Sequence, residues 1–324
     1  MEQRRLGATG LWVSRLALGT MTWGRDTDED DASSRLKTFV EAGGTLIDTA
    51  DVYVDGESER VVGRLLQGVV RREDVVVATK AVSRRGQERD RDASRRHLLA
   101  ALDASLERLQ TSYVDLWQMH AWDPRTPIEE TLAALDTAVS SGRARYVGIS
   151  NYNGWQTAKA ATWQLAWPGR ARLVSSQMEY SLLQRGIERE VIPATTDLGI
   201  GILPWSPLGR GVLTGKYRSG TPADSRGASP DYQRFVAPYL DDRATRIVGS
   251  VLTAADGLGV SPLAVALAWV RDRPGVVAPI VGARTAAQLK GSLDADDVTL
   301  PGEIRDALDD VSAPKSGYPE TQRR

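Results

Sequence analysis

Four polar residues have the types and the spacing to carry out proton transfer on a small molecule. Asp48 and Tyr53 lie five positions apart, and Lys80 and His120 stand at the ends of later apolar runs. A phenol has a pKa near ~10, so it exchanges protons poorly at neutral pH unless a cation stabilises its phenolate. A charge pair at ~4 Å and an effective dielectric constant near ~20 interacts by ~4 kcal/mol, which is enough to lower a tyrosine pKa by a few units.

We expect Lys80 to supply that cation, Asp48 to keep the lysine charged and oriented, and His120 to hydrogen-bond the reacting oxygen. Tyr53 would then supply or remove the proton. Taken singly, each residue has an ordinary explanation, such as a structural ion pair or a partly buried aromatic ring. If all four residues met at one site, a catalytic role would be favoured over these structural roles. The reaction that they suit is the addition of hydride to a carbonyl group.

The elements that must bring these residues together are short apolar runs that alternate with longer amphipathic segments. This alternation is typical of a parallel α/β protein. Because a (β/α)8 TIM barrel builds its active site at the carboxyl ends of many strands, polar residues at those ends predict this fold. The eight predicted strands are 16–20, 45–50, 75–80, 113–120, 144–149, 173–177, 200–205 and 276–282.

Other segments complete a single predicted domain over residues 1–324. Residues 4–13, punctuated by glycine, predict a β-hairpin that closes the bottom of the barrel. Thr27 is the expected N-cap of the first helix, which Gly43 and Gly44 should terminate. The long aperiodic stretch 206–242 follows the seventh strand and is expected to be a functional loop, whereas residues 312–324 form an irregular tail.

The composition restricts the function further. Lysine and arginine number 41 against 42 aspartates and glutamates, so no broad positive field favours nucleic acid or an anionic membrane. The chain has no cysteine and only two histidines, which argues against disulfides and metal clusters. The first residues lack a signal-peptide core, and no apolar run approaches the ~20 residues of a membrane span. We expect a cytosolic protein with a small-molecule partner, and a homo-oligomer is compatible with the sequence.

Several motifs, in the same order along the chain, resemble the signatures of the aldo-keto reductase superfamily. They are Leu-Ile-Asp-Thr-Ala-Asp-Val-Tyr at 46–53, Gly-Glu-Ser-Glu at 56–59, Ala-Thr-Lys at 78–80, Ser-Leu-Glu-Arg-Leu at 105–109, Tyr-Val-Asp-Leu at 113–116 and Arg-Tyr-Val-Gly-Ile-Ser-Asn at 145–151. Within the superfamily, the pattern is similar to the branch of potassium-channel β-subunits and bacterial aldo-keto reductases. No G-x-G-x-x-G follows the first strand and no P-loop occurs, so a Rossmann fold and a P-loop fold are disfavoured.

The resemblance implies NADPH as cofactor and Asp48, Tyr53, Lys80 and His120 as a catalytic tetrad, with Tyr53 as general acid. It implies that Ser150, Asn151 and Gln177 hold the nicotinamide carboxamide and that Tyr180 stacks on its ring. The implied cofactor-binding residues are Thr20, Met21, Asp48, Ser150, Asn151, Gln177, Tyr180, Trp205, Ser206, Pro207, Leu208, Gly209, Gly211, Lys216, Arg226, Gly282, Arg284 and Gln288.

The adenosine end of the implied cofactor site departs from the family in one place. Arg284 offers a fork of donors to a 2′-phosphate, which NADH lacks, and so favours NADPH. Relatives often carry a Glu-Asn pair after the residue that matches Gln288, but this chain has Gly291 and Ser292. This departure makes strong discrimination against NADH less secure.

The tryptophans divide into two groups by position. Trp23 and Trp122 follow the first and fourth predicted strands and are expected, together with Tyr53 and His120, to line the substrate pocket. Those in helical segments are expected to pack internally: Trp155, Trp163, Trp167 and Trp269.

The sequence favours an NADPH-dependent reductase of an aldehyde or ketone, and two alternatives stay open. One is a reductase of a sugar-linked ketone in a deoxysugar or secondary-metabolite pathway. The other is a slow-turnover module that senses NADPH for a partner.

Overall fold

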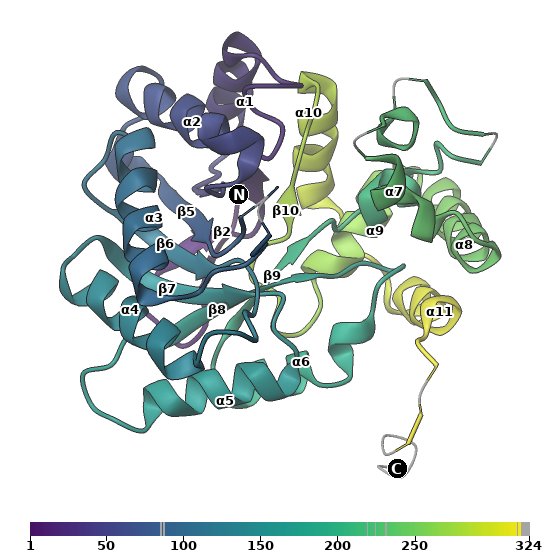
Figure 1. Cartoon of the computed structure of the whole chain (residues 1–324). Helices are drawn as coiled ribbons and strands as arrows, with labels where there is room; N and C mark the ends of the chain where they lie inside the picture. The colour runs from purple at the N-terminus through teal and green to yellow at the C-terminus, as the bar shows by residue number, and fades with distance from the viewer. Residues whose placement is uncertain are drawn as a thin grey trace.

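The computed structural model is a nearly closed barrel of parallel strands surrounded by helices, which confirms the predicted (β/α)8 fold (Figure 1). It describes residues 1–84, 86, 88–218, 220–223, 225–230, 232–315 and 317–318, apart from the side chain of Arg226. Within these ranges the strands follow the order β10-β3-β4-β5-β6-β7-β8-β9. Their bounds are β3 (Ala17–Gly19), β4 (Leu46–Asp48), β5 (Val76–Ala81), β6 (Val114–Met119), β7 (Ala144–Ser150), β8 (Leu173–Glu179), β9 (Gly201–Trp205) and β10 (Ile280–Val281).

The last strand, β10, is shorter than predicted. We call the junction between β9 and the segment 276–281 the seam, because few backbone pairs hold it. Only Ile280 and Val281 pair with β3, while Val276 forms an isolated bridge with Ile202 of β9. Pro279 lies between these two points, and a proline has no N–H group to donate to a strand ladder. The predicted run 276–282 is therefore divided into a bridge and a two-residue strand.

A hairpin of β1 (Gln3–Arg5) and β2 (Trp12–Ser14) covers the end of the barrel where the strands begin. Leu6 and Val13 are fully buried and pack with inward-facing residues such as Ala78 and Leu116. The backbone N–H of Ala8 donates to the carbonyl oxygen of Gly199, just before β9. The hairpin predicted from residues 4–13 is confirmed, and it closes the end opposite the carboxyl ends of the strands.

The helices form the outer layer. They are α1 (Glu29–Glu41), α2 (Glu57–Gly68), α3 (Arg95–Arg108), α4 (Ile128–Ser140), α5 (Gly154–Leu165), α6 (Val191–Asp197), α7 (Gln233–Val236), α8 (Asp242–Leu258), α9 (Pro262–Arg271), α10 (Ala286–Asp294) and α11 (Gly302–Ser312). The N-cap of α1 is Asp28, which accepts from the backbone N–H of Asp31, and not the expected Thr27. The Thr27 hydroxyl is instead a hydrogen-bond acceptor for Arg35. The end of α1 is as predicted, because Gly43 follows it with a φ of 82°.

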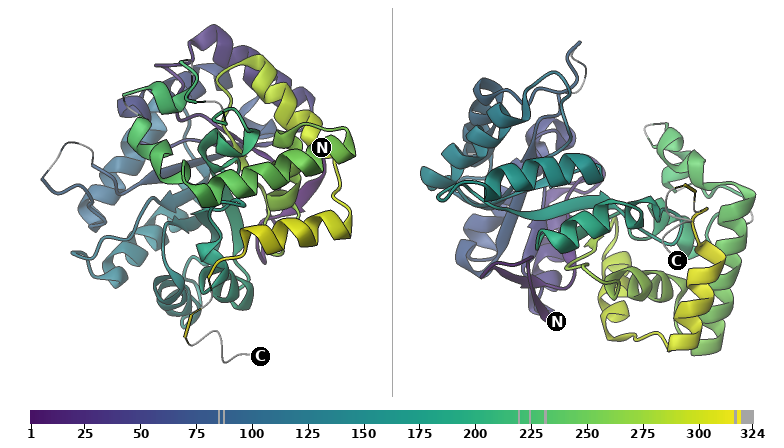
Figure 2. Two further views of the ribbon diagram at one scale, coloured as in Figure 1. Left: turned by 90° about the vertical axis from the view of Figure 1, so that its right-hand side faces the viewer. Right: turned by 90° about the horizontal axis from the view of Figure 1, so that it is seen from below.

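Helices α8, α9 and α11 gather with α7 on one side of the barrel (green to yellow in Figure 2). The stretch 206–242, which was expected to be a loop, folds into short turns of helix: η4 (Gly209–Thr214), η5 (Arg226–Ala228), α7 and η6 (Ala237–Tyr239). Among the described residues, no single helix is long and apolar enough to span a membrane. Only α8 and α9 taken together reach that length, as a pair bent by 102°.

Three tryptophans near α5 are exposed, which makes the expectation of internal packing wrong for them. Trp155, Trp163 and Trp167 are 56%, 39% and 63% exposed. The face that α5 turns inward carries mainly small residues, among them Ala160 and Ala161, so the bulky rings lie outside. Trp269, by contrast, is only 1% exposed and packs as predicted.

Candidate active site

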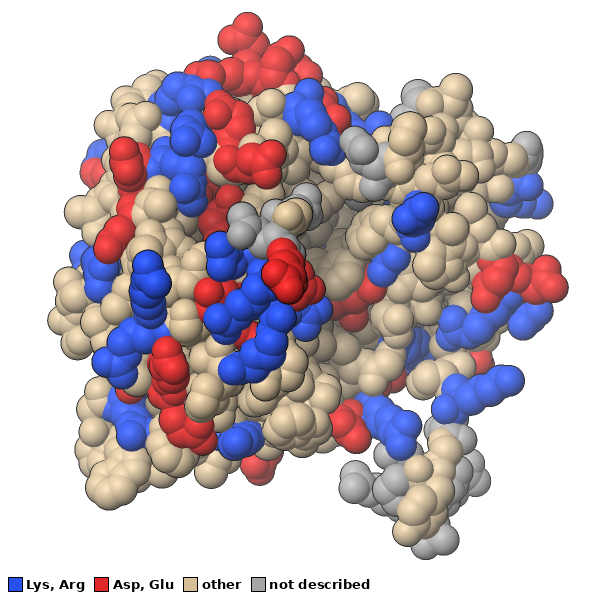
Figure 3. Space-filling view, viewed as in Figure 1, with Lys and Arg blue, Asp and Glu red and all other residues tan. Residues whose placement is uncertain are grey.

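A cavity of about 490 Å³ lies at the carboxyl ends of the barrel strands, bounded on one side by the segment after β9. It lies in the hollowed part of the face seen in Figure 3, where basic and acidic side chains are interspersed around it. The predicted site residues that line it are Thr20, Met21, Asp48, Tyr53, His120, Ser150, Asn151, Gln177, Trp205, Ser206, Pro207, Leu208, Gly211, Lys216, Gly282, Arg284 and Gln288. The structure thus brings most of the predicted residues to one cavity.

Lys80 lies directly beneath this cavity and joins the other members of the predicted tetrad. Its Nζ atom donates to Oδ2 of Asp48 at 2.7 Å, to the carbonyl oxygen of Thr49 at 2.8 Å and to the Tyr53 hydroxyl at 3.3 Å. Burial on its own would lower the pKa of Lys80, but the Asp48 carboxylate and the Tyr53 hydroxyl outweigh burial and raise it. The lysine is therefore a buried cation beside the phenol.

Tyr53 and His120 face each other at the mouth of this cluster. Their rings meet edge to face, with centroids 5.9 Å apart, and both side chains line the cavity. Tyr53 begins the short helix η1 (Tyr53–Gly56), in which Val54 and Asp55 have φ angles of 50° and 53°. A β-branched residue such as Val54 rarely adopts this left-handed conformation, and such strained backbone is concentrated at functional sites. The turn fixes the direction in which the phenol leaves the backbone.

Residues at the ends of β7 and β8 connect these groups to one another. Gln177 donates from Nε2 to Oδ1 of Asp48 at 2.7 Å, and the Ser150 hydroxyl donates to the carbonyl oxygen of Gln177 at 2.8 Å. Asn151 donates from Nδ2 to the carbonyl oxygen of His120 at 2.9 Å. The strand ends are thus linked by side chains as well as by the sheet.

Tyr180 does not line the cavity, which corrects its predicted position. It is 1% exposed, its hydroxyl donates to Glu188 at 2.7 Å, and its ring packs against Trp269. Successive strand residues point to opposite faces, so a cavity-facing Gln177 directs the side chain three positions later away from the cavity. Trp205, by contrast, is an aromatic residue after β8 that does line the cavity, and its indole N–H donates to Oδ1 of Asn151 at 3.1 Å.

Three further predicted residues do not line the cavity. Trp23 is buried at 1% exposure, and Trp122 packs edge to face against Tyr152 and Trp155, so these two rings are engaged elsewhere. Gly209 is buried against Leu183, to which an added Cβ atom would come within 2.6 Å. The side chain of Arg226 lies outside the described part of the chain.

Two residues that sequence reasoning missed form a wall of the cavity with Trp205. Arg210 donates from Nε and Nη2 to the two carboxylate oxygens of Glu179, at 2.8 and 2.7 Å. Its guanidinium carbon lies 3.8 Å from the ring centroid of Phe235. The Phe235 ring is in turn stacked on Trp205 at 6.3 Å and 19°. Phe235 follows Trp205 by thirty positions in an aperiodic stretch, so no spacing signal pointed to it.

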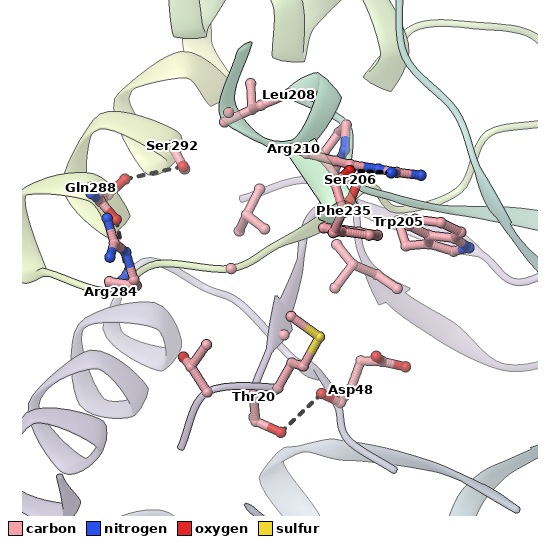
Figure 4. A pocket seen from close by; sticks show the side chains of 18 of the residues that line it. Thr20, Asp48, Trp205, Ser206, Leu208, Arg210, Phe235, Arg284, Gln288 and Ser292 are labelled. Carbon is pink, nitrogen blue, oxygen red and sulfur yellow. Dashed lines mark hydrogen bonds between the residues drawn. The ribbon is translucent and has the colours of Figure 1, made fainter. Parts of the chain in front are cut away.

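The opposite side of the cavity carries a second arginine, Arg284 (Figure 4). Arg284, Gln288 and Ser292 lie across from Trp205, Phe235 and Arg210 in this view. The backbone N–H of Arg284 donates to Oε1 of Gln288 at 2.9 Å, and the Ser292 hydroxyl donates to the carbonyl oxygen of Gln288 at 3.1 Å.

Lys216 adds a third cation to the lining, after Arg210 and Arg284, and lies close to the chain at Gly211. The Nζ atom of Lys216 would lie 3.2 Å from a Cβ atom added at Gly211. Gly209, Arg210 and Gly211 have φ angles of 55°, 59° and 92°, a conformation that the two glycines adopt at low cost. Within the described ranges, no group of three or more His, Cys, Asp or Glu side chains could hold a metal ion.

Comparisons with known proteins show the family of the chain. The aldo/keto reductase family model matches residues 15–313. The uncharacterized oxidoreductase YrpG of Bacillus subtilis is 38% identical over 96% of both chains. A probable voltage-gated potassium channel subunit beta of Arabidopsis thaliana is 35% identical over 100% of both. The versiconal hemiacetal acetate reductase of Aspergillus parasiticus is 33% identical over 98% of this chain and 99% of its own.

The fold, the cavity at the strand ends and these matches define an oxidoreductase of the carbonyl-reducing type. The chain belongs to the aldo/keto reductase family.

Proposed function

We propose that this protein uses NADPH to reduce an aldehyde or ketone to an alcohol, with Tyr53 as the general acid. The observation that carries the proposal is the Tyr53 hydroxyl, which lies 3.3 Å from the buried Lys80 ammonium and lines the same cavity as His120. A phenol in this position has both a stabilising cation and access to a small molecule.

The residues around the cavity fit the proposed cofactor. Ser150, Asn151, Gln177 and Trp205 would hold the nicotinamide end, because they offer polar groups and one ring face beside the tetrad. Lys216 and the backbone of η4 would hold the phosphates. Arg284, beside Gln288 and Ser292, would bind the 2′-phosphate, which supports NADPH over NADH. When bound, the reduced dinucleotide supplies the hydride.

The chain's own residues handle the proton. Tyr53 gives its hydroxyl proton to the carbonyl oxygen of the substrate, and the phenolate that remains is stabilised by Lys80. Asp48 keeps the lysine charged and in place. His120 hydrogen-bonds the same carbonyl oxygen and fixes its direction toward Tyr53. The oxygen thereby receives its proton and the alcohol forms.

The direct test is Tyr53→Phe, which removes the proton donor and keeps the ring. We expect turnover to fall by about 10²- to 10⁴-fold, the usual range for a general acid, while NADPH still binds. Fluorescence titration of NADPH and steady-state reduction of a panel of carbonyl compounds measure the two effects. Normal turnover by the variant would disprove the role of Tyr53.

A second candidate follows from the full-length similarity to probable potassium channel β-subunits. In that case the protein would retain NADPH and turn it over slowly, so that its occupancy signals to a partner. Single-turnover mixing of NADPH-loaded protein with aldehydes, aromatic ketones and a nucleotide-linked keto sugar separates the candidates. Fast oxidation with one of them supports an enzyme and identifies its substrate class, whereas negligible oxidation with tight retention supports the sensor.

A further inference from the structure

We propose that Gln177 is a positioning residue for the catalytic carboxylate, in addition to any contact that it makes with the cofactor. In this role, which rests on the proposed function, its amide group holds Asp48 in line with Lys80. The Gln177 amide thereby couples the nicotinamide site to the tetrad.

The contact between Gln177 and Asp48 crosses the mouth of the barrel. Asp48 ends β4 and Gln177 lies on β8, and three strands separate β4 from β8 in either direction around the order of eight. No backbone ladder therefore fixes the distance between these two side chains. The 2.7 Å hydrogen bond from Gln177 Nε2 to Asp48 Oδ1 does so directly.

Both oxygens of the Asp48 carboxylate are engaged, each by a different donor. Lys80 donates to Oδ2 and Gln177 to Oδ1, both at 2.7 Å. Asp48 and Gln177 are each 3% exposed and Lys80 is fully buried. Water is thus largely excluded, and hydrogen bonds to a charged group are strongest under these conditions. Without the amide, Oδ1 would lose its partner and the carboxylate would be free to turn away from Lys80.

The charge of Asp48 also sets which end of the amide Gln177 presents to the cavity. A carboxylate only accepts hydrogen bonds, so the NH₂ end of Gln177 must face Asp48. The other end is the carbonyl oxygen, which is an acceptor, and Gln177 lines the cavity. The amide N–H of a nicotinamide carboxamide is the matching donor. Gln177 is itself held firmly, because its backbone carbonyl oxygen accepts from the Ser150 hydroxyl at 2.8 Å and from the Asn151 N–H at 3.1 Å.

The experiment compares Gln177→Met with wild type in single-turnover hydride transfer at saturating cofactor. It uses NADPH and its 3-acetylpyridine analogue, which has no carboxamide N–H. We expect the Met variant to slow hydride transfer by about 10- to 100-fold with both cofactors, because it removes one hydrogen bond to a buried charge. A penalty that disappears with the analogue, or that affects only cofactor affinity, would overturn the positioning role.

Gln177→Glu gives a second and independent readout. The introduced carboxyl group would repel Asp48 when it is ionised, whereas its protonated form can donate to Asp48 as the amide does. Hydride transfer by this variant should therefore recover as the pH is lowered, relative to wild type and to Gln177→Met at the same pH. A rate ratio of this variant to wild type that stays constant with pH would contradict the proposal.

Gln118→Met is the matched control. Gln118 is a fully buried glutamine on β6 that contacts Ser175 and lies outside the tetrad. Its replacement should leave the rate of hydride transfer unchanged, and a loss equal to that of Gln177→Met would mean that any buried glutamine of the barrel has this effect. If wild-type protein oxidises NADPH with none of the carbonyl compounds, the proposed function is wrong. The positioning role of Gln177, which depends on that function, is then wrong as well.

Discussion

The guanidinium group of Arg210 donates a hydrogen bond to each carboxylate oxygen of Glu179 and so joins the segment after β9 to the end of β8. The pair is only 13% and 14% exposed in its side chains. The hydroxyl of Tyr239 also donates to Glu179, at 3.0 Å, and the Phe235 carbonyl oxygen accepts from Arg210. Two points of the stretch 206–242 are thereby fixed to one carboxylate of the barrel, and a third, Phe235, is held through Arg210.

Loss of this anchor should loosen the bound cofactor. We expect Arg210→Met to raise the dissociation rate of NADPH by about 10- to 100-fold, because breaking a largely buried charged contact costs a few kcal/mol. Stopped-flow displacement of NADPH measures the rate. Arg234→Met, at an exposed arginine on α7, is the control and should leave the rate unchanged. Equal dissociation from wild type and Arg210→Met would show that Glu179 and Arg210 do not hold the segment.

The pair of Lys80 and Asp48 should affect stability and activity in different ways. Lys80→Met leaves the Asp48 carboxylate buried without its cation, which costs about 3–5 kcal/mol of unfolding free energy. The double variant with Asp48→Asn removes the stranded charge, so we expect most of that stability to return while turnover stays low. Chemical denaturation and steady-state assays measure the two properties. Turnover that returns together with stability would show that Lys80 acts only in folding.

A buried carboxyl near the tetrad predicts a pH dependence of stability. Burial, with a smaller contribution from Glu59, raises the pKa of Asp51 to about 7, although Arg108 and Lys80 act in the opposite direction. The Oδ1 atom of Asp51 is buried without a hydrogen-bond partner, although the residue as a whole is partly exposed. Between the unfolded-state pKa near ~4 and about 7, the folded state holds more protons, so the contribution of Asp51 to stability falls as the pH rises.

The variant Asp51→Asn isolates this effect from all other titrating groups. We expect its melting temperature to exceed that of wild type above pH 7, and the difference between the two proteins to shrink as the pH falls toward 4. Melting curves at several pH values measure the difference. A difference that does not vary with pH would mean that Asp51 titrates normally in the folded protein.

Cofactor choice should depend on Arg284. We expect Arg284→Ala to weaken NADPH binding by about 10- to 100-fold, since a charge-assisted contact to the 2′-phosphate is lost, and to leave NADH binding nearly unchanged. Lys290→Ala is the control, because Lys290 lies on helix α10, which begins just after Arg284, and pairs with Asp294. Titration with each cofactor measures the ratio of the dissociation constants for NADPH and NADH. Equal losses for NADPH and NADH would show that Arg284 does not read the 2′-phosphate.

The barrel was predictable from the sequence because short apolar runs alternate along the chain with segments of helical periodicity. The polar residues at the predicted strand ends, such as Asp48, His120 and Gln177, therefore meet at one edge of the sheet. The predicted position of Tyr180 conflicts with side-chain alternation, because Tyr180 follows β8 directly and comes three positions after Gln177, which directs the two side chains to opposite faces.

Other features carried no signal in the sequence. Arg210 and Phe235 meet only through the tertiary path of the stretch 206–242, which has no periodicity. The exposed rings of Trp155 and Trp163 have the same residue type as the buried Trp269. Residue type alone does not separate them, because Trp155 and Trp163 lie off the inward face of α5, which carries mainly small residues.

The seam between β9 and β10 has a dynamic consequence. Two backbone hydrogen bonds hold it at the Ile202–Val276 bridge, from Ile202 to Gly275 and from Val277 to Ile202. Amide deuteration should therefore begin there sooner than in the fully laddered centre of the sheet. Trp205 and Gly282, on either side of the seam, both line the cavity. A dinucleotide that contacts both residues would connect the two sides of the seam. Amide deuteration at the seam should therefore be slower in the cofactor-bound protein than in the cofactor-free protein.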